Sequence, residues 1–242
     1  MSTLFISDLH LDAALPHLTR LFVHFMREQA PSADAVYILG DLFEAWVGDD
    51  DDRPETQVFI DELKRLADTR TPLFVMHGNR DFLIDETFVG RTGCTLLPEP
   101  SVIDLYGTPT LLLHGDSLCT DDVKHQESRK LMRSEDWKQR FLAQTLDERI
   151  AQAREYRSMS RKHLKDAPDA IMDVNANAVI ALMQEYNVQK MIHGHTHRPA
   201  IHRLSVNNKE AKRIVLGDWN SHGSVLVCDA GEERLTSFTI TK

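Results

Sequence analysis

The segment VQKMIHGHTH, residues 188–197, joins a short apolar run to a cluster of three histidines. A short run rich in Val, Met and Ile suits a strand that is buried on both faces. Histidines with one glycine between them, placed directly after such a strand, indicate a metal site, because imidazole is a common metal ligand. We therefore expect His195 and His197 to bind metal.

Four earlier apolar runs also end in polar residues. The runs are TLFI (3–6), AVYIL (35–39), LFVM (73–76) and TLLL (110–113). Because a buried strand delivers its last residues to the carboxyl edge of a sheet, we expect the polar side chains to meet there. The seven candidate metal ligands are Asp8, His10, Asp41, Asn79, His114, His195 and His197.

Seven ligands are too many for one ion. A single catalytic zinc takes three protein ligands, whereas seven ligands that share a bridging carboxylate fit two ions roughly 3.5–4 Å apart. Asp41 is the expected bridge. The set contains carboxylate, amide and imidazole groups but no thiolate, which favours borderline or hard divalent metals. We expect Mn²⁺, while the residues leave iron and zinc open.

Each motif alone has a simpler interpretation. Asp8 could begin a turn or cap a helix, and the GNRD segment (78–81) could be only a turn, since Gly and Asn tolerate positive φ. A buried histidine could be satisfied by a backbone carbonyl. The occurrence of all five motifs in this order makes coincidence a poor explanation.

The ordered set resembles the calcineurin-like metallophosphoesterase superfamily from Asp8 to Asp218. Within it, the chain looks like the UDP-2,3-diacylglucosamine hydrolase family, whose members act in bacterial lipid A synthesis. The segments that carry this resemblance are GDLFEAWVGDDD (40–51), HGNRDFL (77–83), HGDSLCTDD (114–122), IMDVN (171–175), IHGHTHRP (192–199) and LGDWN (216–220).

The resemblance implies a reaction and a set of site residues. Water attacks the α-phosphorus of a UDP-linked diacylated glucosamine lipid, which gives UMP and 2,3-diacylglucosamine 1-phosphate. By position, the family's first metal would be bound by Asp8, His10, Asp41 and His197, and its second by Asp41, Asn79, His114 and His195. The residues implied in catalysis are Asp41, Asn79, Arg80 and His195. Substrate contacts fall at Asn79, Arg80, Asp122, Ser160 and His195, and at the lid positions Leu164 and Ala167, where the family usually has polar or basic residues.

Arg80 bears on the reaction by its own chemistry. Many members of the superfamily have a histidine at this position, which can protonate an alkoxide leaving group. Arginine is a poor proton donor, but its planar fork pairs bidentately with phosphate oxygens. A phosphate leaving group, with a second pKa of about 6, departs as an anion without a proton donor. Arg80 therefore favours pyrophosphate cleavage, the alternative being a structural pair with Asp81.

The composition is that of an ordinary globular protein. With 242 residues, 42% of them hydrophobic, the chain suits one domain with an insertion. No apolar stretch approaches 18 residues, and the start runs directly into a predicted strand without a basic n-region or a cleavage site, so we expect no signal peptide. Three distant cysteines, an odd number, are expected to be free thiols. We expect a cytoplasmic protein without a nucleic-acid partner, and we infer no obligate protein partner.

The order of elements predicts an α/β fold. Segments 15–29 and 55–68 have helical spacing between strand runs, and short strands follow residue 197, from which we expect a second, largely antiparallel sheet packed on the first. The predicted architecture is a two-sheet metallophosphoesterase sandwich flanked by helices. Its core comprises residues 1–121 and 168–242, and residues 122–167 form a helical lid insertion.

The insertion is basic in an acidic chain. Residues 122–165 contain 12 Lys and Arg against seven Asp and Glu, a net +5, so the remainder of the −9 chain carries −14. An apolar stripe that includes Trp137 and Phe141 has helical spacing and predicts a helical hairpin. A solvated face is the simpler interpretation. We expect a lid that covers acyl chains opposite Trp46 and meets an anionic membrane surface, peripherally on the cytoplasmic face of the inner membrane.

Two other functions remain open. The chain could cleave another nucleotide pyrophosphate or a phosphodiester. Alternatively, it could be a non-catalytic scaffold with the same fold, although its complete ligand set argues against a decayed site.

Overall fold

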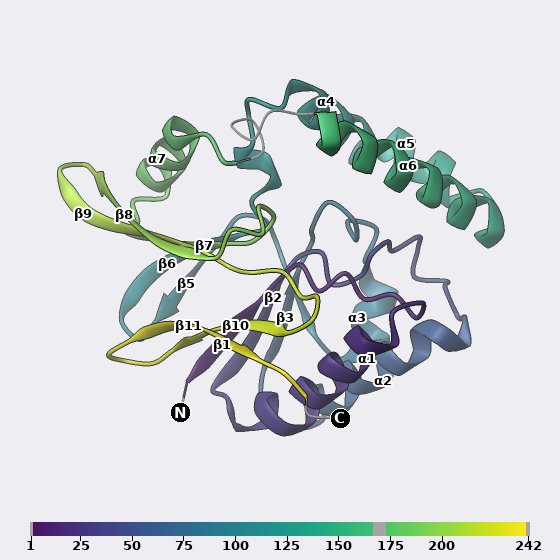
Figure 1. Cartoon of the computed structure of the whole chain (residues 1–242), viewed down its shortest axis with the longest axis horizontal. Helices are drawn as coiled ribbons and strands as arrows, with labels where there is room; N and C mark the ends of the chain where they lie inside the picture. The colour runs from purple at the N-terminus through teal and green to yellow at the C-terminus, as the bar shows by residue number, and fades with distance from the viewer. Residues whose placement is uncertain (1, 167–172, 241–242) are drawn as a thin grey trace.

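Two β-sheets pack face to face in the computed structural model, which describes residues 2–166 and 173–240 (Figure 1). The first sheet has the order β11-β10-β1-β2-β3-β4, and β1 to β4 run parallel. Its strands are β1 (Thr3–Ile6), β2 (Ala35–Leu39), β3 (Leu73–Met76), β4 (Thr95–Leu97), β10 (Gly223–Cys228) and β11 (Glu233–Phe238).

The second sheet mixes parallel and antiparallel pairs in the order β5-β6-β7-β9-β8. Its strands are β5 (Ser101–Leu105), β6 (Thr108–Leu113), β7 (Lys190–His193), β8 (Ala200–Val206) and β9 (Lys209–Val215). Strand β7 is parallel to both neighbours, whereas β5·β6 and β8·β9 are antiparallel. Apolar side chains from both sheets, including Phe5, Leu39 and Ile192, fill the space between them.

The α/β sandwich is confirmed, but the expected grouping of the late strands was wrong. Strands β10 and β11 do not join β8 and β9; they extend the first sheet, where β10 pairs antiparallel with β1. The second sheet also contains two parallel pairs, so it is not largely antiparallel. The reason lies in β10, whose residues are mostly buried on both faces, as in an interior strand.

Three helices cover the outer face of the first sheet (Figure 1). They are α1 (Pro16–His24), α2 (Pro54–Ala67) and α3 (Glu86–Thr92), and α1 continues through one π-helical turn at Phe25–Gln29 and a 3₁₀ turn at Ala30–Ser32. Proline begins both α1 and α2, where its missing N–H costs nothing. On the second sheet lies α7 (Ala176–Glu185), which packs Val179 and Met183 against it.

The predicted insertion contains three helices and not the expected hairpin. These are α4 (Val123–Met132), α5 (Glu135–Leu142) and α6 (Leu146–Asp166), which form a separate layer in Figure 1. The helical segment is interrupted twice, before α5 and before α6, because a helix N-cap lies at each interruption. The Ser134 side chain accepts from Trp137 N, and Thr145 and Glu148 form a reciprocal capping box. The limits at residues 122 and 167 stay a prediction.

The residues of the predicted apolar stripe in the insertion differ in how deeply they are buried. Trp137 stacks on Phe141 with ring centroids 4.7 Å apart, and Phe141 is buried, whereas Leu142 is 44% exposed. Of the helices in the described part, none is long and apolar enough to cross a membrane. Cys94, Cys119 and Cys228 are buried free thiols, as predicted.

Candidate metal centre

The seven predicted ligands converge, although they leave two sheets and not one. Loops after β1, β2 and β3 in the first sheet and after β6 and β7 in the second carry them. The carboxyl ends of these strands meet at the same end of the sandwich. In order along the chain, the ligands are Asp8 and His10, Asp41, Asn79, His114, and His195 with His197.

Five of these residues have an unusual backbone. Asp8, His10, Asp41, His195 and His197 have positive φ values between 49° and 69°. Residues other than glycine rarely adopt this left-handed backbone conformation, which costs on the order of 1–3 kcal/mol per residue. Such strain persists only where the surrounding structure imposes it, and it clusters at functional sites.

One group of ligands surrounds Asp8. Its Oδ2 accepts from Ser7 Oγ at 2.6 Å and from His195 N at 2.9 Å, which fixes the carboxylate. Its Oδ1 lies 3.2 Å from His197 Nε2, and that nitrogen lies 3.2 Å from His10 Nε2. The Nδ1 of His10 is buried with no hydrogen-bond partner among the described residues. Two imidazoles and a carboxylate that face one another in this way fit a cation.

A second group lies around Asp41. Its Oδ1 is 3.7 Å from His114 Nε2, and its Oδ2 is 3.9 Å from His10 Nδ1, so Asp41 stands between the two groups. His114 Nδ1 is held at 2.9 Å from the carbonyl of Leu39, which leaves Nε2 pointing into the site, 3.0 Å from Asn79 Oδ1. A backbone carbonyl behind an imidazole is the usual support of a metal-binding histidine.

The last predicted ligand, His195, joins this second group. Its ring lies against that of His114, with centroids 5.1 Å apart, and it stacks on His125 of α4 at 5.4 Å. The seven side chains therefore form one cluster. Together the two groups offer carboxylate, amide and imidazole donors, which suit divalent metal ions.

The cluster contains both ionisable carboxylates and histidines, and their pKa values shift in different directions. Burial opposes ionisation of Asp8, but the imidazoles of His197, His114 and His10 hold its pKa well below the usual value. Burial lowers the pKa of His195 to about 3, so this side chain is neutral and can donate a lone pair to a metal. Burial would also lower the pKa of His114, but Asp41 and other nearby carboxylates raise it to about 9. Several carboxylates are buried close together here, and a bound cation would neutralise their negative charge.

Glycines allow the loops to approach closely. A Cβ on Gly40, whose φ is +85°, would lie 2.6 Å from both Gly78 Cα and His114 Nδ1. A Cβ on Gly78 would overlap the Asp41 carboxylate, and one on Gly194 would overlap Ser7 and Asp8. The close approach of these loops therefore requires the glycines in the motifs.

Arg80 lies at the edge of the cluster, but its partner is not Asp81. Its Nε is 3.1 Å from Asp41 Oδ2, and its Nη1 pairs with Glu44. Asp81 instead accepts from the backbone N–H groups of Leu42 and Gly78, each at 2.7 Å, and so ties two ligand loops together. The alternative pair of Arg80 with Asp81 was wrong.

Helix α4 supports the cluster from behind. Arg129 donates to Asp116 Oδ2 at 2.8 Å and also pairs with Glu99. Glu99 Oε1 in turn accepts from His114 N at 2.8 Å. The sequence analysis missed Glu99, Arg129 and Glu44 as supporting residues, since isolated charged residues outside the motifs carry no pattern.

A cavity of about 500 Å³ opens beside the cluster, between the core and helices α4 to α6. Asn79 and Arg80 line it at the metal side, Trp46 forms part of its wall, and Ser160 lines it from α6. Much of the remaining lining is large and apolar. These residues are Phe82, Leu83, Leu131, Met132, Trp137, Phe141, Tyr156 and Met159, and we call the space the apolar cavity.

The structure does not bring the other predicted substrate residues into the cluster. Asp122 caps α4, where its side chain accepts from His125 N at 3.1 Å. Leu164 belongs to α6, although its side chain is outside the described part, and Ala167 lies outside the described residues. The geometry thus brings together the seven metal candidates with Arg80, and places Ser160 across the apolar cavity.

Comparison with known proteins agrees with this geometry. The family model for calcineurin-like phosphoesterases matches residues 1–199. The chain belongs to this family. It is 51% identical over 228 residues to the UDP-2,3-diacylglucosamine hydrolase of Photobacterium profundum, covering 94% of this chain and 93% of that one. It is 48% identical over 240 residues to the protein of the same name from Cellvibrio japonicus, covering 99% and 100%.

The family membership agrees with the solved structures. A structure of an archaeal phosphodiesterase aligns over 99% of this chain and 100% of its own with a TM-score of 0.50, at 12% sequence identity. That similarity supports the fold only. The resemblance read from the motifs is confirmed, and the chain is a member of the UDP-2,3-diacylglucosamine hydrolases within the calcineurin-like phosphoesterases.

Proposed function

We propose that this chain hydrolyses the pyrophosphate bond of UDP-2,3-diacylglucosamine in lipid A synthesis. Water attacks the α-phosphorus, the bond from that phosphorus to the bridging oxygen breaks, and UMP and 2,3-diacylglucosamine 1-phosphate form. One observation carries the proposal. The metal-ligand cluster and the apolar cavity meet at Asn79 and Arg80, so a lipid can lie beside a phosphoryl-transfer site.

The cluster is proposed to hold two divalent ions, with Mn²⁺ as the first candidate. Asp41 stands between the two groups of ligands and is the proposed bridge. Two ions held by these residues would lower the pKa of a bound water towards neutrality and would stabilise the attacking and leaving oxygens.

Arg80 is proposed to bind the pyrophosphate, and no residue is required to protonate the leaving group. The guanidinium keeps its charge and presents parallel N–H donors to phosphate oxygens. The sugar phosphate leaves as a stable anion, which makes a general acid unnecessary. Asn79 and His195 both lie against His114 and are proposed to orient the α-phosphoryl group, in addition to binding metal.

The lid residues are proposed to hold the lipid. Ser160 faces the apolar cavity, and its hydroxyl is suited to the glucosamine ring. Asp122, Leu164 and Ala167 keep the role of substrate contacts as a proposal. The aromatic and aliphatic lining between α4, α5 and the core is proposed to cover the acyl chains, since burial of apolar area is favourable by about 25 cal/mol per Å².

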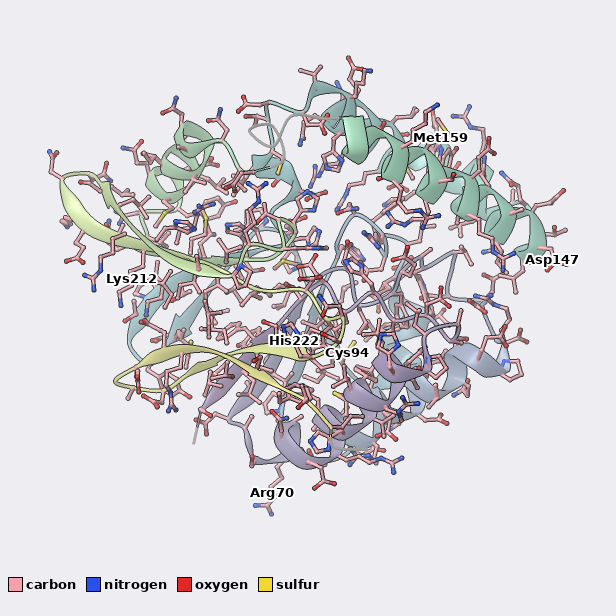
Figure 2. All side chains as sticks on the ribbon, in the orientation of Figure 1. Arg70, Cys94, Asp147, Met159, Lys212 and His222 are labelled. Carbon is pink, nitrogen blue, oxygen red and sulfur yellow. The ribbon has the colours of Figure 1, made fainter. Side chains whose placement is uncertain are left out.

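The proposed location is the cytoplasmic face of the inner membrane. Four apolar side chains are exposed among the described residues of the lid: Val123 is 60% exposed, Leu131 57%, Leu142 44% and Met159 62% (Met159 is labelled in Figure 2). Leu131 and Met159 also line the apolar cavity. A lipid could therefore pass from a membrane into the cavity over these residues.

Hydrolysis in ¹⁸O-labelled water tests the reaction. The enzyme, loaded with Mn²⁺, is given UDP-2,3-diacylglucosamine in detergent micelles, and mass spectrometry of both products follows. The label is expected in UMP alone. Label in the lipid phosphate would reverse the position of attack, and turnover of soluble dinucleotides without any on the lipid would assign a different nucleotide pyrophosphatase.

A further inference from the structure

A second cavity, of about 480 Å³, adjoins the apolar cavity, and the segment Glu44–Trp46 lines both. Its walls come from the loop after β1, the start of α2, and the face of α6 that passes over them (Figure 1). Four arginines line it: Arg53, Arg154, Arg157 and Arg161. We call it the arginine recess.

The recess and the apolar cavity share a wall at the edge of the metal-ligand cluster. Glu44 and Arg157 line both spaces. Glu44 Oε2 lies 3.8 Å from Nδ1 of the metal candidate His10, so the recess opens beside the cluster. A substrate whose reacting phosphorus lies at the cluster can therefore extend into both spaces at once.

The lining of the recess suits a polar group with both donors and acceptors. Besides the arginines, the acidic residues Asp12 and Glu55, the hydroxyl residue Thr56 and the aromatic residues Phe43 and Phe59 line it. Ribose hydroxyls can donate to carboxylates, while pyrimidine carbonyls and phosphate oxygens can accept from guanidinium groups. Basic residues also line the apolar cavity, but the apolar lining is more extensive there. In the recess an acyl chain would remove the charged groups from water without compensation.

We propose that the arginine recess binds the uridine monophosphate part of the substrate. This inference rests on the proposed function, which requires a nucleotide on one side of the scissile bond and a diacylated sugar on the other. The large aromatic side chains of Phe82, Trp137 and Phe141 line only the apolar cavity, so the acyl chains occupy that space and the nucleotide occupies the recess. A volume of about 480 Å³ falls within the usual range for small-ligand sites.

Arg154 is the arginine best placed to recognise the nucleotide. Positions 154, 157 and 161 are three and four residues apart, which places them on one face of α6. Arg157 already pairs with Glu44 at 3.0 Å, and Arg161 lies 3.9 Å from the same carboxylate. Arg154 forms no ion pair with any described residue, so its guanidinium is available to a ligand in the recess.

Product inhibition separates the two spaces. Initial rates on UDP-2,3-diacylglucosamine are measured with added UMP and, separately, with added 2,3-diacylglucosamine 1-phosphate, for the metal-loaded wild type and for Arg154→Gln. We expect the inhibition constant of UMP to rise about tenfold in the variant, while that of the lipid product is unchanged. Arg140→Gln, an exposed arginine on α5, is the matched control and should change neither constant.

The reverse pattern is expected from the apolar cavity. Phe82→Ala should weaken inhibition by the lipid product and leave that by UMP unchanged. An unchanged constant for UMP in Arg154→Gln, or weaker UMP inhibition in Phe82→Ala, would overturn the assignment of the recess. Failure of the proposed function is distinct, since the wild type would then not turn over the lipid substrate at all.

Discussion

Arg157 of α6 donates from Nε to Glu44 Oε1 at 3.0 Å and so joins the lid to the loop that carries Asp41. The second oxygen of Glu44 pairs with Arg80. Burial and the neighbouring charge of Arg80 lower the pKa of Arg157, and Glu44 opposes this effect. One carboxylate therefore holds two guanidinium groups, from the core and from the lid, at the edge of the metal-ligand cluster.

Glu44→Gln is expected to reduce kcat/KM about tenfold, mainly through a higher KM. The amide cannot neutralise Arg80 and Arg157, whose mutual repulsion then moves α6 away from the site; a charged hydrogen bond of this kind contributes about 1.5–3 kcal/mol. Steady-state kinetics measures the effect, and hydrogen exchange of residues 146–162 should increase. Glu135→Gln, an exposed residue of the lid, is the control. Wild-type KM in Glu44→Gln would show that the lid is held by other contacts.

Asp41→Ala is expected to abolish turnover and to lower the bound metal below the proposed two ions per chain. The carboxylate stands between His10 and His114, so its loss removes a donor from both groups. Metal analysis after gel filtration, with circular dichroism to show that the chain is folded, provides the measurement. Two retained ions in a folded variant would contradict the bridging role.

Arg80→Ala is expected to reduce kcat/KM by about a hundredfold or more, and Arg80→His should not restore it. If the side chain binds phosphate and transfers no proton, only a cation with the reach of arginine can replace it, and Arg80→Lys should recover part of the activity. The pH dependence of kcat distinguishes the roles. Full activity in Arg80→His, with a new acidic limb near the histidine pKa, would mean that the leaving group needs a proton.

Glu233 on β11 is expected to stabilise the fold in a pH-dependent way. It connects the first sheet to the second through Lys190 Nζ at 2.6 Å and Lys212 Nζ at 2.9 Å (Lys212 is labelled in Figure 2). Burial would raise the pKa of Glu233, but the two lysines lower it below the usual 4.5. Since the folded pKa is the lower one, the stabilisation is fully present above about pH 5 and is lost as the pH falls through the folded value.

Glu233→Gln should therefore lower the free energy of unfolding by about 1–2 kcal/mol at pH 7, and the difference from wild type should shrink towards pH 3. Urea unfolding across that pH range measures it. Glu210→Gln is the control, because its pair with Arg203 is well exposed and contributes little. A difference that stays constant with pH would show that packing, and not charge, is responsible.

The metal-ligand cluster was predictable because every ligand lies within a few residues after the end of a buried apolar run. The ends of the apolar runs place Asp8, Asp41 and His114 just after strand ends, and the carboxyl ends of parallel strands lie at the same edge of a sheet. The division into two sheets was not predictable in the same way. The pairing of β10 with β1 joins Cys228 to Thr3, and no local pattern encodes contacts between residues so far apart in the chain.

The roles of single charged side chains could not be predicted from the sequence either. Glu44 belongs to an acidic segment that also contains Asp49, Asp50 and Asp51, and nothing in the composition marks it as the residue at the metal site. Arg157 is one of 12 basic residues in the insertion. Their pairing depends on how α6 lies over the core, which the chain order alone does not determine. The expectation that the basic residues as a group face a membrane therefore needs refinement, because Arg157 is committed to Glu44.

The lid should bind anionic vesicles through its exposed cations and apolar side chains together. Lys130 and Lys162 are exposed on α4 and α6, the same helices that carry Leu131 and Met159. Salt shortens the reach of charge from about 8 Å near physiological ionic strength to about 3 Å at 1 M, whereas insertion of apolar side chains resists salt. Wild type is therefore expected to lose part of its binding at high salt and to retain the rest.

Co-sedimentation with phosphatidylglycerol vesicles, compared with neutral phosphatidylcholine, separates these contributions. Lys130→Gln with Lys162→Gln should remove the salt-sensitive part, and Leu131→Ser with Met159→Ser should remove the salt-resistant part. Arg203→Gln with Lys209→Gln, exposed on the second sheet, changes the net charge equally and is expected to bind like wild type. If this control lost as much binding as the lid variants, the attraction would depend on net charge alone and would not place the lid against the membrane.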